Sequence, residues 1–373
     1  MEARMDLFDK LGPDLSSEIL TYLEDPSDLV RASFVSRSWR HCVIANGLWK
    51  QFCLRMFPQL SRVARVIELN NGSEKEPVEV GSSYQMEWES LKRDDRVYAL
   101  LARYCTSFLV GNCISQALSA SSTDNYPEES IENTLEPADI VERRGSYWSS
   151  KGQSNPAIPE TLIYKLASEL CVVTEINIRP FQAYFQSGLP IYSARSVRFR
   201  MGHPRNLADV GSDLPIDSCP GSADDKFVWT YTSQEFPMAQ EFELQKFKLP
   251  EPVLCVGGIL QIELLGRVQR QEMDGLFYIC VSYVQVVGRS LSPAFGVEIL
   301  EPSGKFVLKN DMKHKLHTHP SLPEDEPGEI SADRLQRRLR DLQHIVNLLQ
   351  GNVVDVEYEF GEEENAAWDA DDL

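Results

Sequence analysis

Closely spaced cysteine pairs are absent from this chain of 373 residues, although it contains eight cysteines. A structural zinc site usually takes two of its ligands from a C-x-x-C pair, so a site of that kind is not expected. His314, His317 and His319 stand close together, but no neighbouring cysteine or pair of carboxylates accompanies them. Several cysteines lie inside apolar runs, where a free thiol behaves as a small hydrophobic side chain. We therefore expect neither a bound metal nor another cofactor.

Long uninterrupted apolar runs and a basic leader segment are also missing. The longest apolar stretch, from Val97 to Ala120, contains Arg103, Asn112 and Gln116, which the interior of a bilayer tolerates poorly. The first residues of the chain do not combine positive charge with a following apolar segment, as a secretory signal does. These features predict a soluble protein of the cytoplasm or nucleus, with no membrane among its partners.

Positive charge is scarce. The chain has 37 Lys and Arg residues against 56 Asp and Glu residues, which gives a net charge of −19. Nine of the acidic residues lie between Asp355 and the C-terminus, so the rest of the chain carries −10. Nucleic acids and anionic membranes bind cationic surfaces, so no nucleic acid is expected as a partner either.

Motifs for catalysis are missing as well. The chain has no glycine-rich phosphate loop, because Gly257-Gly258 is typical of a turn between strands. Sequence separation alone identifies no nucleophile paired with a base. We therefore expect a protein that is not an enzyme.

The first sixty residues, by contrast, predict a compact helical module. Leu15, Ile19 and Leu23 recur at helical spacing, and Pro13 suits a first helical turn, where no amide donor is needed. The segment 25–28, Asp-Pro-Ser-Asp, predicts the end of this helix and the cap of a second. The same signals predict two more helices. Such a small core cannot bury all of the apolar side chains, which indicates a surface for a partner.

Specific motifs recur in order along this module. They are Leu11-Gly12-Pro13-Asp14-Leu15, then Leu23, then Asp28-Leu29-Val30-Arg31, then Val35-Ser36-Arg37-Ser38-Trp39-Arg40, and finally Leu48-Trp49-Lys50. In this order and spacing they resemble an F-box, over about residues 5–58. F-boxes commonly begin with Leu-Pro, whereas here Gly12 occupies the place of that proline and Pro13 follows it.

The resemblance implies an adaptor-binding module. By it, the module binds a Skp-type adaptor, and through the adaptor the cullin of a ubiquitin ligase, with an apolar surface. The contact residues implied in this way are Leu11, Pro13, Leu15, Ile19, Leu20, Leu23, Val35, Ser36 and Trp39. The alternative for some of them, Ile19 and Val35 in particular, is a place in the internal core.

Residues 59–125 are predicted to form a helical bridge followed by a linker. Tyr84, Trp88 and Leu91 follow each other at intervals of four and three, and helical spacing continues to Phe108. Aromatic side chains at this spacing are expected to pack in a core and not to form a ligand cage. The polar segment 121–130 is typical of a surface linker.

From residue 126 to residue 300 the apolar pattern changes to a period of two. Thr174, Ile176 and Ile178 alternate with polar neighbours, and Val197 and Phe199 do the same in a later segment. Many short segments of this kind, separated by turns that contain Gly or Pro, predict an antiparallel β-sandwich.

A second resemblance concerns this central region. The segments 147–152, 159–166 and 173–178 resemble elements of a discoidin or galactose-binding-like jelly roll. That resemblance implies a ligand site in loops at one end of the sandwich. The family binds sugars, lipids, peptides or protein surfaces, and the fold alone does not choose among them.

Two groups of residues are candidates for substrate binding. Trp148, Ser149 and Lys151 offer an aromatic platform and hydrogen-bond donors within one loop. Arg198 and Arg200 lie on the same face of a predicted strand, within the densest basic cluster of the chain, and suit an acidic or phosphorylated partner. The alternative for this cluster is a solvated strand face.

The C-terminal part is predicted to contain a loop and a helix over residues 301–354. Leu335, Leu339 and Leu342 begin an alternation of four and three that suits docking onto another part of the protein, or dimerisation. Residues 355–373 are acidic and are expected to be a disordered tail.

Together these observations predict an α+β multidomain protein. It would contain an N-terminal helical F-box over residues 1–58, a helical bridge, an antiparallel jelly-roll-like β-sandwich, a C-terminal helix and an acidic tail. The predicted function is substrate recognition in an SCF-type cullin-RING ubiquitin ligase, with the target protein bound by the sandwich. The alternative is a non-degradative glycan- or peptide-binding module whose F-box serves assembly.

Overall fold

Four short helices form the N-terminal part of the computed structural model, as predicted. They are α2 (Pro13–Thr21), α3 (Pro26–Val35), α4 (Arg37–Ala45) and α5 (Leu48–Met56). The side chain of Asp25 accepts a hydrogen bond from the Ser27 amide at 2.7 Å and caps α3. Ser36 caps α4 in the same way, because its Oγ accepts from the Trp39 amide at 3.2 Å. Local capping signals therefore define where these helices begin.

The structure describes residues 11–70, 73–74, 83–107, 110–138, 140–141, 144–205, 223–300 and 303–313. All of them belong to one unit, Met1–Leu316. The predicted C-terminal helix and acidic tail lie outside the described residues, and so do the three clustered histidines. No helix in the described ranges is both long and apolar enough to cross a membrane.

A long helix, α6 (Ser83–Thr106), packs against α3, α4 and α5 and accounts for the helix predicted in the bridge. Its residues Val97, Tyr98 and Leu101 are completely buried against them. The Tyr98 carbonyl accepts a hydrogen bond from the Cys53 thiol at 3.3 Å. The rings of Trp88 and His41 stack with their centroids 4.6 Å apart. The predicted core role is wrong for Tyr84, which is 74% exposed, and Trp88 is half-buried against His41 and lies outside the main core of the module.

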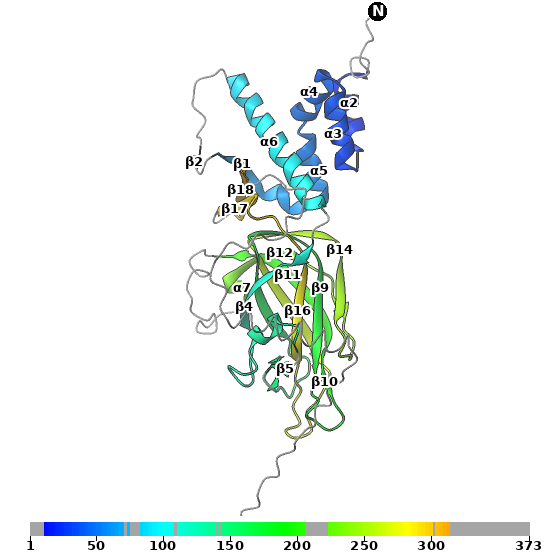
Figure 1. Ribbon diagram of the computed structural model, residues 1–373, viewed down its shortest axis with the longest axis vertical. Coiled ribbons are helices and arrows are strands. Elements are labelled where there is room, and N and C mark those ends of the chain that lie inside the picture. The colour runs from blue at the N-terminus through cyan, green and yellow to red at the C-terminus, as the bar shows by residue number, and fades with distance from the viewer. Residues whose placement is uncertain are drawn as a thin grey trace, which may run out of the picture. The chain divides into compact units, whose positions relative to one another are not determined.

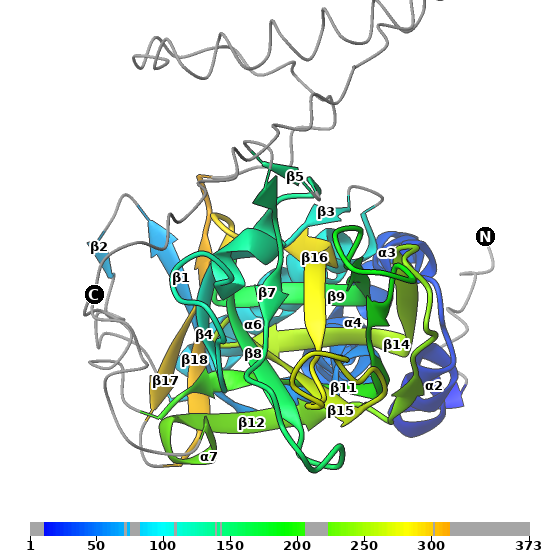
Figure 2. The same ribbon diagram turned by 90° about the horizontal axis from the view of Figure 1, so that it is seen from below.

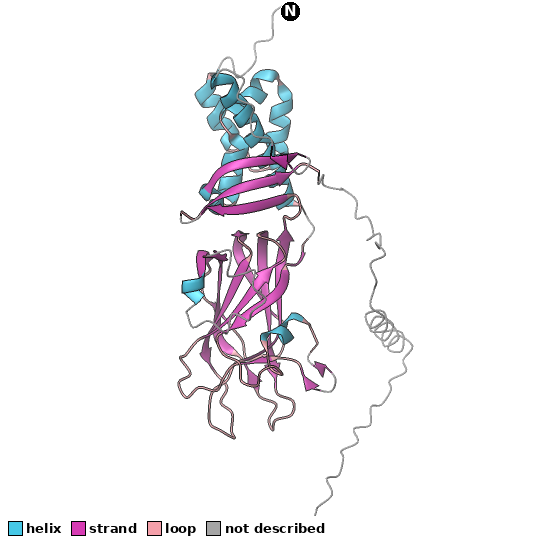
Figure 3. Cartoon of the chain, turned by 90° about the vertical axis from the view of Figure 1, so that its left-hand side faces the viewer, coloured by secondary structure: helices cyan, strands magenta, loops and turns pink. Residues whose placement is uncertain are grey.

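A small sheet follows, where the sequence predicted helix and loop. It contains β17 (Phe295–Leu300), β18 (Lys305–Asp311), β1 (Val63–Asn70) and β2 (Ser73–Glu74) in this order, and a 3-10 helix (Pro58–Arg62) leads into it. Strand β1 pairs in parallel with β18, with Val66 opposite Leu308. Figure 3 shows this sheet beside the helices. The prediction of helix and loop was wrong because the partner of β1 lies more than 200 residues away along the chain. No local turn in the sequence therefore indicates the pairing.

Two antiparallel six-stranded sheets form the predicted β-sandwich (Figure 1). One has the order β10-β9-β16-β3, with β14 on β9 and β7 on β16. The other has the order β12-β11-β15-β8-β4, with β13 on β11. The strands of the first sheet are β3 (Gly111–Asn112), β7 (Trp148–Ser149), β9 (Leu170–Gln182), β10 (Ile191–Tyr192), β14 (Gln245–Val256) and β16 (Cys280–Ser290). Those of the second are β4 (Ile114–Ala120), β8 (Glu160–Leu166), β11 (Ala194–Pro204), β12 (Phe227–Thr232), β13 (Phe236–Pro237) and β15 (Ile259–Arg267).

Three further elements lie around the sandwich. They are a 3-10 helix (Ile131–Leu135), the strand pair β5 (Ile140–Val141) and β6 (Arg144–Gly145), and the short helix α7 (Ala223–Lys226). Strands β3 and β4 come from the region predicted as bridge, and β17 belongs to the small sheet although the sequence placed it in the sandwich.

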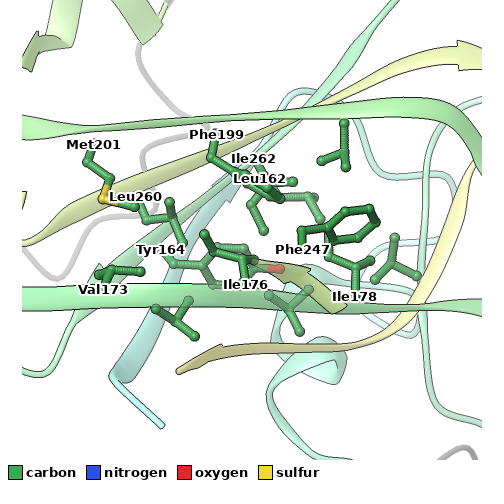
Figure 4. Packing of buried hydrophobic residues seen from close by; sticks show 14 of the residues in the cluster. Leu162, Tyr164, Val173, Ile176, Ile178, Phe199, Met201, Phe247, Leu260 and Ile262 are labelled. Atoms are coloured by element: carbon green, nitrogen blue, oxygen red, sulfur yellow. The ribbon is translucent and has the colours of Figure 1, made fainter. Parts of the chain in front are cut away.

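The core between the two large sheets follows from the alternation that the sequence shows. Phe199 and Met201 of β11 point inward and face Ile176 of β9, as Figure 4 shows. The buried Tyr164 hydroxyl is satisfied by the Thr134 hydroxyl at 2.8 Å. The apolar side chains of this core are buried, which leaves ligand binding to the loops and edges.

A second core joins the helices and the small sheet to one end of the sandwich. Leu170 and Leu254 of the sandwich belong to the same apolar cluster as Leu48 of α5 and Phe306 of β18. Arg289, near the end of β16, donates hydrogen bonds to the Tyr104 carbonyl in the last turn of α6, at 2.6 Å, and to the Ser107 carbonyl just after the helix. The helical module and the sandwich therefore share buried surface and are not joined by a linker alone.

Candidate functional site

Helices α2 and α3 carry an unusual number of exposed apolar side chains. These are Leu15, Ile19, Tyr22, Val30, Phe34 and Val35, which we call the α2–α3 surface. Phe34 is the most exposed, at 83%. On the same helices Leu20 and Leu29 are buried in the core. Apolar residues thus occupy both faces of each helix, although one face would suffice for folding, and this indicates a partner surface.

The structure exposes three of the predicted adaptor contacts. Leu15, Ile19 and Val35 are each at least half exposed. The alternative of a place in the internal core therefore does not apply to Ile19 or Val35. Leu11 is half-buried. Pro13 is the first residue of α2, and its side chain lies outside the described part.

The other predicted contacts have roles inside the module. Leu20 is only 4% exposed and belongs to the core, so its prediction as a surface contact is wrong in this structure. Leu23 and Trp39 are half-buried and pack against the same core. Ser36 caps α4. An apolar position in a family motif does not by itself distinguish a partner contact from a core residue.

Sequence reasoning missed three residues of the α2–α3 surface, namely Tyr22, Val30 and Phe34. Helical spacing in the sequence could have identified them. Tyr22 lies three positions after Ile19, and Phe34 lies four positions after Val30, so each continues an exposed stripe on its helix.

An apolar groove of about 750 Å³ adjoins this surface. Val30 belongs to both, and the floor of the groove also includes Trp49 and Leu100. Arg31 and Arg103 line it as well. The groove extends the apolar area that a partner on α3 can reach.

In the sandwich, the predicted aromatic platform is not on the surface. Trp148 is 0% exposed, and its indole Nε1 donates to the Ser122 carbonyl at 3.0 Å. Ser149 is also buried, whereas Lys151 is exposed. The Trp148 prediction is therefore wrong, because the residue fills the sandwich core behind the loop.

The predicted basic face is largely neutralised. Arg198 and Arg200 both contact the carboxylate of Glu263 on the neighbouring strand, Arg200 at 3.4 Å. Arg200 also pairs with Asp224 at 2.8 Å. The hydrogen bond to Glu263 raises the pKa of the Arg198 guanidinium. His203, in the same cluster, is buried. These ion pairs favour the alternative of a solvated strand face for the two arginines.

A pocket lies at the other end of the sandwich, among loops as the resemblance implies, and of the predicted substrate-binding residues Ser149 lines it. It has a volume of about 250 Å³ and lies where β9 ends and β16 begins. Its lining includes Asp124, Glu129, Tyr147, Phe181, Tyr192 and Tyr278. Figure 2 looks onto this end of the sandwich. These residues come from segments far apart in the chain, so only the fold brings them together.

A buried ion pair holds the loops around this pocket. The guanidinium of Arg267 is completely buried and contacts the Glu160 carboxylate. It also donates to the Ser150 hydroxyl at 2.8 Å and to the Lys151 and Phe277 carbonyls at 3.0 Å. One side chain thereby fixes loops that lead to both walls of the pocket.

No group of three or more His, Cys, Asp or Glu side chains within the described ranges is placed to hold a metal ion. The described cysteines are all free thiols, and most of them are buried. Burial raises the pKa of the Cys280 thiol, beside the pocket, to about 12. This thiol is therefore a poor nucleophile at neutral pH.

Solved structures with a partial likeness to the chain include sugar-binding modules, a lectin and an allantoicase. A family 32 carbohydrate-binding module of NanJ from Clostridium perfringens, in complex with galactose, has a TM-score of 0.30 and 13% identity, over 48% of this chain and 99% of that chain. A fucolectin from Morone saxatilis, the striped bass, has a TM-score of 0.28 and 14% identity, over 49% of this chain and 47% of that chain. No conclusion about ligands follows from scores of this size.

Sequence comparisons identify the family. Residues 8–55 match the F-box-like family model, and they include α2 to α4 and most of α5. An F-box protein of Arabidopsis thaliana is 50% identical over 360 residues, which cover 94% of each chain. The chain therefore belongs to the F-box proteins.

Proposed function

We propose that this protein is the substrate-recognition subunit of an SCF-type cullin-RING ubiquitin ligase. Its F-box helices bind a Skp-type adaptor, and through it the cullin, while the sandwich binds the target protein. F-box proteins are generally non-catalytic adaptors, which act by raising the concentration of the target near the ligase. The observation that carries the proposal is the exposed α2–α3 surface within the segment that matches the F-box-like family.

The surface offers a partner several large apolar side chains to bury. Full burial of one large apolar side chain contributes about 1.5–3 kcal/mol. The α2–α3 surface offers six such side chains, all at least 42% exposed before a partner binds. The adjoining groove at Val30 adds to the area that an adaptor can cover.

The shared core supports the part of the proposal in which the sandwich holds the target protein at a defined distance from the adaptor. Strand β9 begins at Leu170, in the core shared with the helices, and passes Phe181 at the distal pocket. With a rise of about 3.3 Å per residue, these two residues lie about 36 Å apart along the strand. A packed connection of this kind holds a bound target at a defined distance from the adaptor.

Co-expression with a Skp-type adaptor tests the proposal. Ile19→Asp and Phe34→Asp place charges on exposed positions of the α2–α3 surface, so we expect a folded protein that no longer forms the 1:1 complex on gel filtration. Val268→Asp, at an exposed apolar position of the sandwich, is the matched control and should retain the complex. Failure of the folded wild-type protein to bind the adaptor would contradict the proposal.

A further inference from the structure

The distal pocket has aromatic walls made of two pairs of rings. Tyr147 and Phe181 stack with their centroids 3.8 Å apart and an angle of 13° between the rings. Tyr192 and Tyr278 meet edge to face at 6.3 Å. All four line the same cavity of about 250 Å³. Such walls suit a flat or cationic group better than an aliphatic chain alone.

The hydroxyl protons of the pocket tyrosines are already engaged. The Tyr147 hydroxyl donates to Glu129 Oε1 at 2.7 Å, and the Tyr192 hydroxyl donates to Gln186 Oε1 at 2.7 Å. The Tyr278 hydroxyl donates to Asp274. Each phenol oxygen keeps lone pairs, and each carboxylate keeps further acceptor sites. A ligand of this pocket must therefore supply hydrogen-bond donors.

Negative charge gathers at the same place. Glu129 and Asp274 both raise the pKa of the Asp124 carboxyl, in addition to the larger effect of burial. Lys151 and Arg270 are the cations nearest to these groups, and both side chains are exposed. Neither forms an ion pair with Asp124, Glu129 or Asp274 among the described residues. A cation entering the pocket would relieve this repulsion.

Two glycines make room for the aromatic walls. A Cβ at Gly145 would lie 2.9 Å from the Tyr147 ring, and a Cβ at Gly152 would lie 2.6 Å from the Tyr278 ring. Any other residue at either position would displace a wall of the pocket. The positions of the two tyrosine rings therefore depend on glycine at these sites.

A second cavity of about 350 Å³ adjoins the first. The two share Glu129, Tyr147 and Phe185, and the second adds Glu128. Phe185 is exposed between them. Two joined cavities with an acidic and aromatic lining suit consecutive residues of an extended chain.

We propose that the distal pocket binds an arginine or lysine side chain of a peptide segment in the target protein. The cationic group stacks on the tyrosine rings and donates hydrogen bonds to Glu129 and Asp124, while neighbouring residues of the peptide occupy the second cavity. The assignment of this peptide to the target rests on the proposed ligase function. The binding itself requires no adaptor.

The test uses the full chain and two mixtures of labelled hexapeptides. One mixture has arginine at a fixed position, and the other has citrulline, a neutral group of nearly the same shape. Randomised flanking positions average over sequence context, and fluorescence anisotropy measures binding. We expect the arginine mixture to bind at least about tenfold more tightly than the citrulline mixture, with a dependence on salt.

Two double variants locate the binding. Asp124→Asn with Glu129→Gln removes the pocket charges and should weaken binding of the arginine mixture at least about tenfold. Glu169→Gln with Glu251→Gln removes the same charge at exposed sites that line neither cavity, and it should bind like the wild type. Both proteins should still form the adaptor complex, so that failure of the peptide assay is distinct from failure of the ligase proposal.

Three results would overturn the inference. One is equal binding of the arginine and citrulline mixtures, and another is equal loss of affinity in both double variants, which would indicate a general attraction of cations to an acidic protein. Competition by galactose without discrimination between the mixtures would assign the pocket to a neutral sugar.

Discussion

At the scale of single residues, the functional surfaces depend on a few buried polar groups. Arg267 is the clearest case, because its guanidinium reaches a carboxylate, a hydroxyl and backbone carbonyls from at least three loops. A sequence cannot reveal this role, since an arginine at the end of a strand is ordinarily solvated. Glu160 begins β8, and only the fold brings it to Arg267. The residues of the distal pocket also come from distant segments, so the sequence alone does not group them.

Arg267→Met should therefore lower the free energy of unfolding by about 3–5 kcal/mol, because it leaves Glu160 as an uncompensated buried charge. Urea denaturation followed by tryptophan fluorescence measures the loss. Lys309→Met is the control: it breaks an ion pair of 2.7 Å with Glu298 that is largely exposed, and it should change stability by less than about 1 kcal/mol. Equal effects of the two substitutions would refute the role given to Arg267.

A second residue-scale prediction concerns pH. Burial raises the pKa of Asp95 on α6 from 3.8 to about 6, although Arg40 and Arg96 oppose the shift. The folded protein thus binds a proton more readily than the unfolded chain between pH 4 and 6, so the free energy of unfolding falls as the pH rises through this window. Asp95→Asn should remove this pH dependence and stabilise the protein by about 1 kcal/mol at pH 7. Thermal denaturation of both proteins from pH 4 to pH 7 tests it, and parallel curves would contradict it.

At the scale of elements, the sequence predicted what local signals determine. The four helices could be predicted because their apolar spacing is regular, and because Asp25 caps α3 and Ser36 caps α4. Several long strands of the sandwich, such as β9, β11 and β15, could be predicted from alternation, whereas β3 and β4 lie in the region predicted as bridge. The pairing of β1 with β18 could not be, since a parallel pair with a partner far along the chain leaves no turn signal. Membership of the α2–α3 surface was predicted only in part, because helical spacing identifies a face and does not say which face is inward.

Ser36→Ala tests the element-scale account of α4. The loss of the cap to the Trp39 amide should destabilise the protein by about 0.5–2 kcal/mol, whereas Ser36→Thr, which keeps the hydroxyl, should restore most of that loss. Chemical denaturation of the three proteins gives both values. If the alanine and threonine variants are equally stable, the Ser36 hydroxyl does not stabilise α4 as a cap. Its role would then be another one, such as the adaptor contact that the family resemblance implies.

At the scale of the whole molecule, the two ends of the sandwich have different surroundings. Residues at one end share a core with the α helices and the small sheet, and the opposite ends of β9 and β16 form the distal pocket. The F-box and the sandwich were each predictable from the sequence. Their shared core could not be predicted, because it depends on Leu170, Leu254 and Arg289. In the sequence these residues do not differ from other strand residues. This packing fixes the distance between the F-box helices and the distal pocket.

The central claim is that α2 and α3 present the adaptor-binding surface, and hydrogen exchange of the full chain with and without a Skp-type adaptor tests it most directly. We expect the adaptor to slow amide exchange over residues 13–35 and to leave the pocket segments 121–130 and 181–192 unchanged. Unaltered exchange over α2 and α3 in a formed complex, or protection at the pocket segments in its place, would contradict the account.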